Sequence, residues 1–275
     1  MEWVEPMKKK FTSFSVSILM LVSLPTIALA EDDVDLALEL SNPVANLVSV
    51  PFQFNYDSNI GANRDGDRAL LNVQPVIPFS LNDDWNVISR TIVPVILQDD
   101  IFPGAGDQFG LGDTVESLFL SPVNIGPSGI IWGAGPVFLL PTGTDDLLSA
   151  KKWGAGPTAV VLRQTGGLTL GLLANHIWSF AGSNERPDIS ATFLQPFITY
   201  TTPDAWTFAL NTETTYNWTN DSWAVPVNAS VSKLLVIDKQ PISLGGALRY
   251  WVEAPDALPH GFGGRLFLTL LFPKR

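Results

Sequence analysis

The sequence predicts an all-β protein: a closed antiparallel transmembrane β-barrel of about twelve strands. Three observations predict this fold. Apolar and polar residues alternate along many short segments, long and short connections tend to alternate between those segments, and tryptophan and tyrosine gather at the segment ends. All three are typical of barrels that cross an outer membrane.

The composition limits the other classes of protein. The 275 residues are 46% hydrophobic but only 16% charged, whereas a soluble domain usually carries about 25% charged residues. The 22 Gly and 21 Pro residues disfavour long helices, and the absence of cysteine excludes disulfides and thiolate sites. With two histidines and a net charge of −11, we expect no metal, no cofactor and no nucleic-acid partner.

Residues 1–30 have the pattern of a secretory signal peptide that is cleaved. Three lysines at 8–10 precede an apolar stretch at 11–27, and Ala28-Leu29-Ala30 has the small-x-small pattern of a cleavage site. The alternative is a membrane-anchoring helix, which needs about 20 apolar residues. Cleavage would leave 13 basic and 25 acidic residues, a net charge of −12 over 245 residues.

The period of two identifies the strands. In 48–56 every even position is apolar and most odd positions are polar, as in a strand with one wet and one dry face. The same alternation recurs in 206–218, 223–232 and 262–272. The expected segments are 46–56, 68–81, 85–98, 110–121, 129–141, 153–163, 168–181, 189–201, 205–217, 223–235, 241–253 and 261–272.

The aromatic residues favour a membrane barrel over a soluble sandwich, whose aromatics would lie at mid-strand. Most tryptophans and all four tyrosines fall near the ends of the expected strands, where interfacial girdles need them. The residues assigned to the girdles are Tyr56, Trp85, Trp153, Trp178, Tyr200, Trp206, Trp218, Trp223 and Trp251.

Prolines conflict with a regular wall, because proline has no backbone N–H to donate to the neighbouring strand, and a closed barrel has no edge strand on which that donor is not needed. Eight of them lie inside expected strands, so they mark wrong boundaries, bulges, or gaps through which an apolar solute leaves sideways. These prolines are Pro51, Pro75, Pro78, Pro94, Pro136, Pro157, Pro196 and Pro226.

Several ordered segments span nearly all of the chain after residue 41: 42–53, 110–114, 141–144, 152–157, 194–197 and Tyr200. Together they resemble one family of outer-membrane transporter proteins, named for a member encoded with a meta-cleavage phenol-degradation pathway. The resemblance implies an outer-membrane barrel with a transport role and supplies no catalytic residues. The sequence Trp-Gly-Ala-Gly-Pro also occurs twice, at 132–136 and 153–157. It is either a local repeat flanking one loop or the result of similar packing needs on two strands of one hairpin, and we favour the second.

A catalytic site is not expected. An outer-membrane lipid hydrolase would need Ser, His and Asn side chains to converge, but alternation places His176 on the face opposite Asn175 and Ser179. Acidic loop residues suit calcium by ligand type. Their spacing is irregular, so we expect solvated acidic loops.

Charges on the wet faces of the strands are candidates for a lumen or selectivity site. A hairpin that pairs Glu253 with Gly261 would place Arg249 opposite Arg265, and such buried like charges require carboxylate partners. A structural ion-pair network and a selectivity constriction are both open alternatives. The candidates are Arg90, Asp113, Glu116, Glu213, Arg249 and Arg265.

The sequence therefore predicts a signal peptide at 1–30, a periplasmic segment at 31–45, a barrel at 46–272 and a tail at 273–275. The segment at 31–45 is expected to form a short helix or arm, either plugging the barrel or disordered. The expected function is passive uptake of small solutes, with hydrophobic or aromatic compounds suggested by the family name. The alternative is a closed structural or adhesive barrel with a packed lumen. Expected partners are outer-membrane lipid, a small solute and the barrel-assembly machinery.

Overall fold

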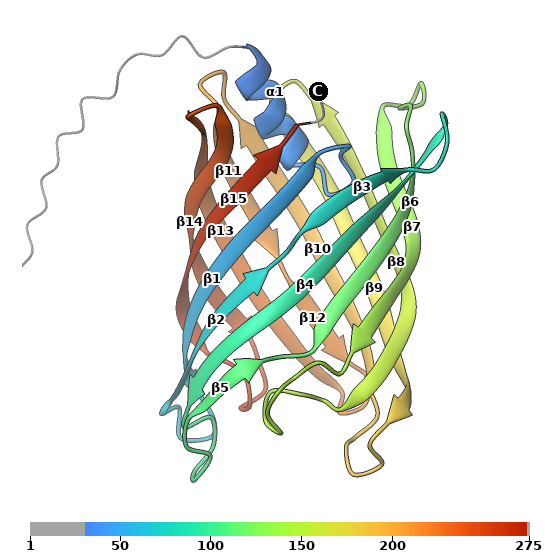
Figure 1. Cartoon of the computed structure of the whole chain (residues 1–275). Helices are drawn as coiled ribbons and strands as arrows, with labels where there is room; N and C mark the ends of the chain where they lie inside the picture. The colour runs from blue at the N-terminus through green and yellow to red at the C-terminus, as the bar shows by residue number, and fades with distance from the viewer. Residues whose placement is uncertain (1–30, 274–275) are drawn as a thin grey trace, which may run out of the picture.

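The structure is a computed structural model that describes residues 31–273. Its strands form a closed barrel (Figure 1). Successive residues of each strand point to opposite faces of the barrel wall. The first and last strands pair from Val48 opposite Phe272 to Tyr56 opposite Gly264, which completes the ring. The expected closed, twelve-stranded antiparallel barrel is confirmed for the described residues. The expected signal peptide lies outside them.

Fifteen strand segments make up the twelve wall strands, because β2 and β3, β5 and β6, and β11 and β12 each form one interrupted strand. The elements are α1 (Glu31–Leu40), β1 (Val48–Ile60), β2 (Gly66–Val73), β3 (Val76–Ser80), β4 (Trp85–Asp99), β5 (Gln108–Leu111), β6 (Thr114–Pro122), β7 (Ile130–Leu140), β8 (Lys152–Thr165), β9 (Leu168–Gly182), β10 (Ser190–Thr201), β11 (Trp206–Thr212), β12 (Thr214–Asn217), β13 (Ser222–Ile237), β14 (Gln240–Glu253) and β15 (Gly261–Phe272).

The two ends of the barrel differ. One, here called the helix end, carries α1, the end of β15 and mostly short turns such as 166–167 and 238–239 (Figure 1). The opposite end, here called the loop end, carries longer connections such as 100–107 and 141–151. No helix in the described part of the chain is both long enough and apolar enough to cross a membrane.

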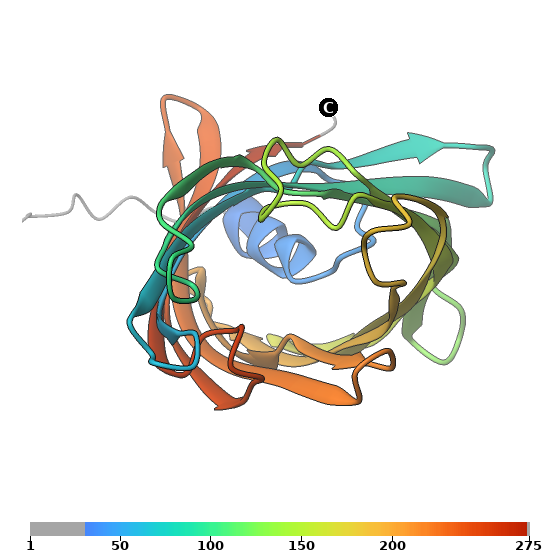
Figure 2. The same ribbon diagram turned by 90° about the horizontal axis from the view of Figure 1, so that it is seen from below.

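Helix α1 lies inside the ring of strands at the helix end (Figure 2). Acidic residues at its start suit the positive end of the helix dipole. Ala37, Val34 and Leu40 pack against Leu234 and Leu271 of the wall. Gln164 of β8 donates a hydrogen bond from Nε2 to the Leu38 carbonyl oxygen at 2.9 Å, so α1 is fixed on two sides of the lumen.

Two interruptions of the wall adjoin the same stretch of β4. The β2–β3 interruption falls at Gln74–Pro75 on one edge, and the β5–β6 interruption at 112–113 on the other. The freed backbone groups find other partners: Gln74 N donates to Pro51 O at 2.9 Å and Gly112 N to Pro94 O at 2.9 Å. Such replacement bonds limit the cost of irregular backbone in a wall.

The repeated Trp-Gly-Ala-Gly-Pro segment lies on the adjacent strands β7 and β8. Pro136 is paired with Pro157, so each proline faces a partner that lacks the same donor. A Cβ on Gly135 or Gly156 would fall within about 2 Å of the carbonyl oxygen of a neighbouring strand. Glycine therefore permits close strand approach here, which explains why both strands of this hairpin use the same five residues.

The connection 141–151 folds inward at the loop end (Figure 2) and is anchored by Asp113, at the β5–β6 interruption. The Asp113 carboxylate accepts hydrogen bonds from Gly143 N at 3.0 Å, Ser149 Oγ at 2.7 Å and Ala150 N at 2.7 Å. Thr144 also pairs with Leu111 on the free edge of β5, through its backbone N and its Oγ1. Asp113 thus holds this loop in place.

We predict that Asp113→Asn loosens the 141–151 loop without unfolding the barrel. Hydrogen bonds to a charged acceptor contribute about 1.5–3 kcal/mol each, so amide exchange at Gly143 and Ala150 should accelerate about tenfold or more. Hydrogen–deuterium exchange measures this. Asp145→Asn is the control, because Asp145 accepts a local bond from Leu147 N. Equal exchange in the two variants would contradict the anchoring role.

Candidate functional site

The lumen contains a cluster of six charged side chains and one amide, here called the central cluster: Asn55, Asp57, Arg68, Arg90, Glu213, Arg249 and Arg265. Glu213 accepts two hydrogen bonds from Arg265, Nη1 to Oε1 at 2.9 Å and Nη2 to Oε2 at 2.8 Å. Arg249 Nη2 lies 3.6 Å from Glu213 Oε2, and Arg249 Nη1 lies 3.3 Å from Asp57 Oδ2. Both guanidinium groups are buried, with side-chain exposures of 8% for Arg249 and 6% for Arg265.

The strand period and register bring these residues together. Asn55 and Asp57 occupy alternate positions of β1, and β1 pairs Asn55 directly with Arg265 of β15. Arg265 donates from Nε to Asn55 Oδ1 at 2.6 Å. Glu213 lies between β11 and β12, and its N–H bonds to Pro226 O at 3.2 Å instead of continuing the regular ladder.

Trp251 completes the partners of Asp57. Its Nε1 donates to Asp57 Oδ1 at 2.9 Å, and the Arg249 guanidinium lies 4.7 Å from the Trp251 ring centroid. A buried carboxylate next to a guanidinium and an indole N–H has the partners that burial of a charge requires.

The other two arginines of the central cluster are held by amides. Arg68 Nε donates to Gln98 Oε1 at 2.9 Å, and Arg90 Nη2 donates to Gln74 Oε1 at 3.0 Å. Within the described residues neither arginine has a carboxylate oxygen within 4.0 Å. The central cluster therefore combines four guanidinium groups with two carboxylates, an excess of two positive charges.

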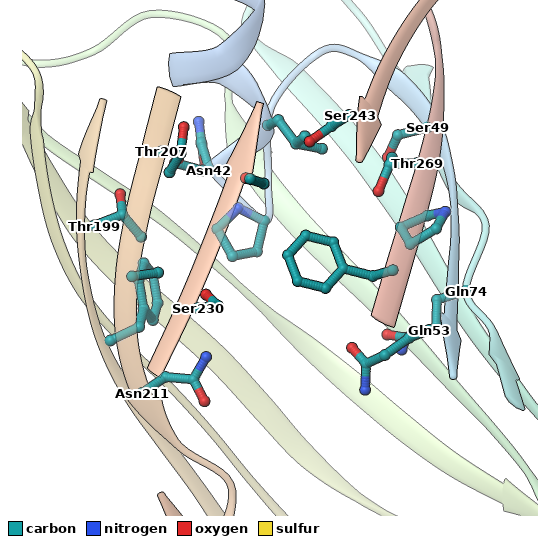
Figure 3. A pocket seen from close by; sticks show the side chains of 18 of the residues that line it. Asn42, Ser49, Gln53, Gln74, Thr199, Thr207, Asn211, Ser230, Ser243 and Thr269 are labelled. Carbon is teal, nitrogen blue, oxygen red and sulfur yellow. The ribbon is translucent and has the colours of Figure 1, made fainter. Parts of the chain in front are cut away.

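Two cavities lie along the lumen. The helix-side cavity, about 300 Å³, is bordered by α1 and lined by hydroxyl and amide side chains (Figure 3). The central cavity, about 430 Å³, is bordered by the central cluster. Six polar side chains line both cavities and are here called the polar ring: Gln53, Gln74, Arg90, Gln195, Asn211 and Arg265.

The structure brings together four of the six candidates. Arg90, Glu213, Arg249 and Arg265 lie in the lumen, but the last hairpin is shifted from the expected register. Trp251 pairs with Gly261, so Arg249 faces Gly263 and Arg265 faces Ala247. A shift by two residues keeps both arginines on the inner face, so the expected face is right although the expected pairing is wrong.

The expected lumen positions of Asp113 and Glu116 are wrong. Asp113 anchors the 141–151 loop, and Glu116 lies on the outer face, where it accepts hydrogen bonds from Ser89 Oγ at 2.6 Å and Thr91 Oγ1 at 2.5 Å. The neighbouring residues Val115 and Ser117 line the central cavity instead. The interruption at 112–113 shifts the alternation by one residue, which reverses the faces along β6.

Trp251 is likewise not a girdle residue, because it points into the lumen toward Asp57. The other aromatic residues assigned to girdles lie at strand ends with their rings on the outer face. Seven are exposed and Trp85 is half-buried against Trp132. The exposed ones are Tyr56, Trp153, Trp178, Tyr200, Trp206, Trp218 and Trp223. Sequence reasoning missed Asp57 and Arg68, which alternation along 48–56 and 68–81 would have placed on inner faces.

His176 lies on the outer face, as expected, away from Asn175, which lines the central cavity. Its Nδ1 lies 2.7 Å from Thr192 Oγ1 and its Nε2 lies 3.4 Å from Ser190 Oγ. Its ring is tilted by 44° to that of Trp178, with 4.0 Å between the ring centroids. Ser179 instead contacts Asp188. His176 is therefore part of an aromatic cluster on the outer surface of the barrel.

The loop-end acids have ordinary solvated environments with local partners. The Lys152 ammonium, 2.8 Å from Asp188 Oδ1, lowers the pKa of that carboxyl, and the Lys151 ammonium lowers the pKa of Asp146. A hydrogen bond with Asp99 raises the pKa of Asp107. Among the described residues, no group of three or more His, Asp or Glu side chains is arranged to hold a metal ion.

These features define the class of protein: a β-barrel of the outer-membrane type with a hollow, arginine-rich lumen. Among solved structures it is similar to an outer membrane channel from Pseudomonas putida F1, with a TM-score of 0.65 and 14% identity, covering 82% of this chain and 96% of that one. The KdgM porin has a TM-score of 0.48 at 14% identity, covering 82% and 100% of the two chains. Outer membrane phospholipase A from Escherichia coli has a TM-score of 0.48 at 11% identity, covering 82% and 92%.

No protein-family model and no curated protein matches the sequence. At these identities the structural likeness establishes the fold.

We predict that Glu213→Gln lowers the free energy of unfolding, because it leaves two buried guanidinium groups near one remaining carboxylate. Removing one partner of a buried ion pair costs about 3–5 kcal/mol. Urea unfolding of the refolded barrel measures the change, with the exposed loop variant Glu185→Gln as the control. Equal stability of the two variants would show that the Arg265–Glu213 pair does not stabilise the barrel.

Proposed function

We propose that the protein is a passive channel of the outer membrane for small solutes and that it belongs to the phenol-degradation meta-pathway family. The observation that carries this proposal is the hollow lumen. Two cavities of about 300 and 430 Å³, each lined by both polar and apolar side chains, share the six side chains of the polar ring. A lumen built only for structure would be filled with packed side chains.

The outer face supports placement in a membrane. Along β14, Leu244, Leu248 and Tyr250 are exposed while Ser243 and Arg249 are buried inside. This apolar-out, polar-in alternation is typical of outer-membrane barrels. The signal peptide expected at 1–30 would supply the export route. Lipid on the outer face, the barrel-assembly machinery and a small solute are the proposed partners.

The alternative, a barrel with a packed lumen, is favoured by one observation. Helix α1 fills part of the helix end, and a second apolar cluster that includes Ile88, Phe119 and Leu173 fills part of the interior. These groups narrow the lumen, but the two cavities remain beside them. A lipid hydrolase receives less support, since His176 contacts hydroxyl groups without a carboxylate or amide partner within the described chain.

We predict that the reconstituted protein conducts ions in planar bilayers and that Ser230→Trp lowers the conductance several-fold. Ser230 lines the helix-side cavity, where an indole would occupy free volume. Val231→Trp is the matched control, because Val231 is the next residue along β13 and lies on the outer face. Absence of conductance from correctly folded wild-type barrels would support the packed alternative, and equal conductance of both variants would contradict the proposed path.

A further inference from the structure

The central cavity has two chemically different sides. Its larger apolar lining residues come from β2, β4, β6, β9 and β10, and they are Leu70, Ile92, Val115, Ile177 and Phe193. Its charged lining residues Arg249 and Arg265 come from β14 and β15, with Glu213 at the β11–β12 interruption. Around the ring, the charged set occupies the arc from the β11–β12 interruption to β15, and the apolar set occupies the longer arc from β2 to β10, together with polar side chains such as Asn72 and Ser117. The cavity is therefore amphipathic.

Arg90 brings a positive charge to the apolar side. It precedes Ile92 by two residues on β4, so both point into the lumen, and Ile92 pairs with Val115 of β6. Arg90 is also a member of the polar ring, so its guanidinium lies where the two cavities meet. Its Nη2 donates a hydrogen bond to the neutral amide oxygen Oε1 of Gln74, which does not compensate the charge of the guanidinium group.

The charges of the cavity are unequally compensated. Glu213 binds Arg265 directly and Arg249 at 3.6 Å, and Asp57 lies 3.3 Å from Arg249. Arg90 interacts with Glu213 only at longer range, because no ion pair joins them within 4.0 Å in the described chain. Of the three arginines that line this cavity, Arg90 is the one without a carboxylate in contact in the described chain, and it lies next to the aliphatic groups of Ile92 and Val115.

We propose that the central cavity binds small organic anions, whose carboxylate group lies at Arg90 and whose hydrocarbon part lies against Ile92, Val115 and Phe193. This inference deepens the proposed function by naming a solute class. A guanidinium group recognises a carboxylate by charge-assisted hydrogen bonds, and transfer of a hydrocarbon chain from water to an apolar wall stabilises the complex. A cation with the same hydrocarbon chain meets the excess of positive charge and binds weakly.

Binding is tested in non-ionic detergent with hexanoate, hexanamide and hexylammonium, which have similar chains and different charges. Isothermal titration calorimetry should show hexanoate binding at least about tenfold more tightly than either of the others, which is the effect of one charge-assisted hydrogen bond. Arg90→Gln should weaken hexanoate binding about tenfold, and Arg90→Lys should weaken it less. Arg163→Gln, an equal loss of charge at an exposed position of β8, should have no effect.

The apolar side has its own variant. Val115→Thr keeps the shape of the side chain and replaces a methyl group with a hydroxyl group, so it should weaken binding of hexanoate but not of acetate. Equal binding of hexanoate and hexylammonium, or equal effects of Arg90→Gln and Arg163→Gln, would overturn the proposal. If Arg90→Gln fails to fold, the proposal is still tested by the affinities of the wild-type protein for the three ligands and by hexanoate binding to Val115→Thr.

Reversal potentials in a potassium chloride gradient separate this inference from the proposed function. The wild-type channel should favour chloride, and Arg90→Gln should reduce that preference while Arg163→Gln leaves it unchanged. Conductance without anion preference and without hexanoate binding would contradict the inference and leave the channel function standing. Hexanoate binding without conductance would contradict the channel function and leave the anion site standing.

Discussion

The bidentate pair between Arg265 and Glu213 is the interaction on which the arrangement of the lumen depends. It joins the last wall strand to the β11–β12 interruption, which are separated around the ring by β13 and β14. Arg249, Asp57 and Trp251 are then linked to this pair by short contacts. These groups hold one another on one side of the barrel, and the remaining arc carries the apolar residues and Arg90 together with amide and hydroxyl side chains such as Asn72 and Ser117. The cavity between the two sides is the consequence.

The wall obeys a second constraint, that backbone donors and acceptors surrounded by lipid must be satisfied within the protein. Prolines at 75, 94, 136 and 157 remove donors, and the wall responds with interruptions, paired prolines and glycines that allow close approach. The interruption at 112–113 is covered by the loop that Asp113 anchors. Irregular wall segments are thus matched by specific side-chain and loop contacts.

The sequence predicted the strands well because the alternation is a local property. A residue's face follows from its neighbours, so the inner positions of Arg249, Arg265 and Glu213 could be predicted without knowing the pairing. The exact partners depend on register, which the loop at 254–260 sets and which shifts Arg249 from Arg265 to Gly263. For Glu116, alternation along the sequence predicted the wrong face of the strand. One irregular step at 112–113 reverses the faces along β6 relative to β5.

The central claim is that the polar ring lies on a water-filled path through the lumen. The chain has no native cysteine, so a single Asn211→Cys substitution places one thiol in the ring. A charged methanethiosulfonate reagent should then reduce the bilayer current irreversibly, while Leu210→Cys on the outer face should be unaffected. Failure of the reagent to reach Cys at position 211 in a folded barrel would contradict the account.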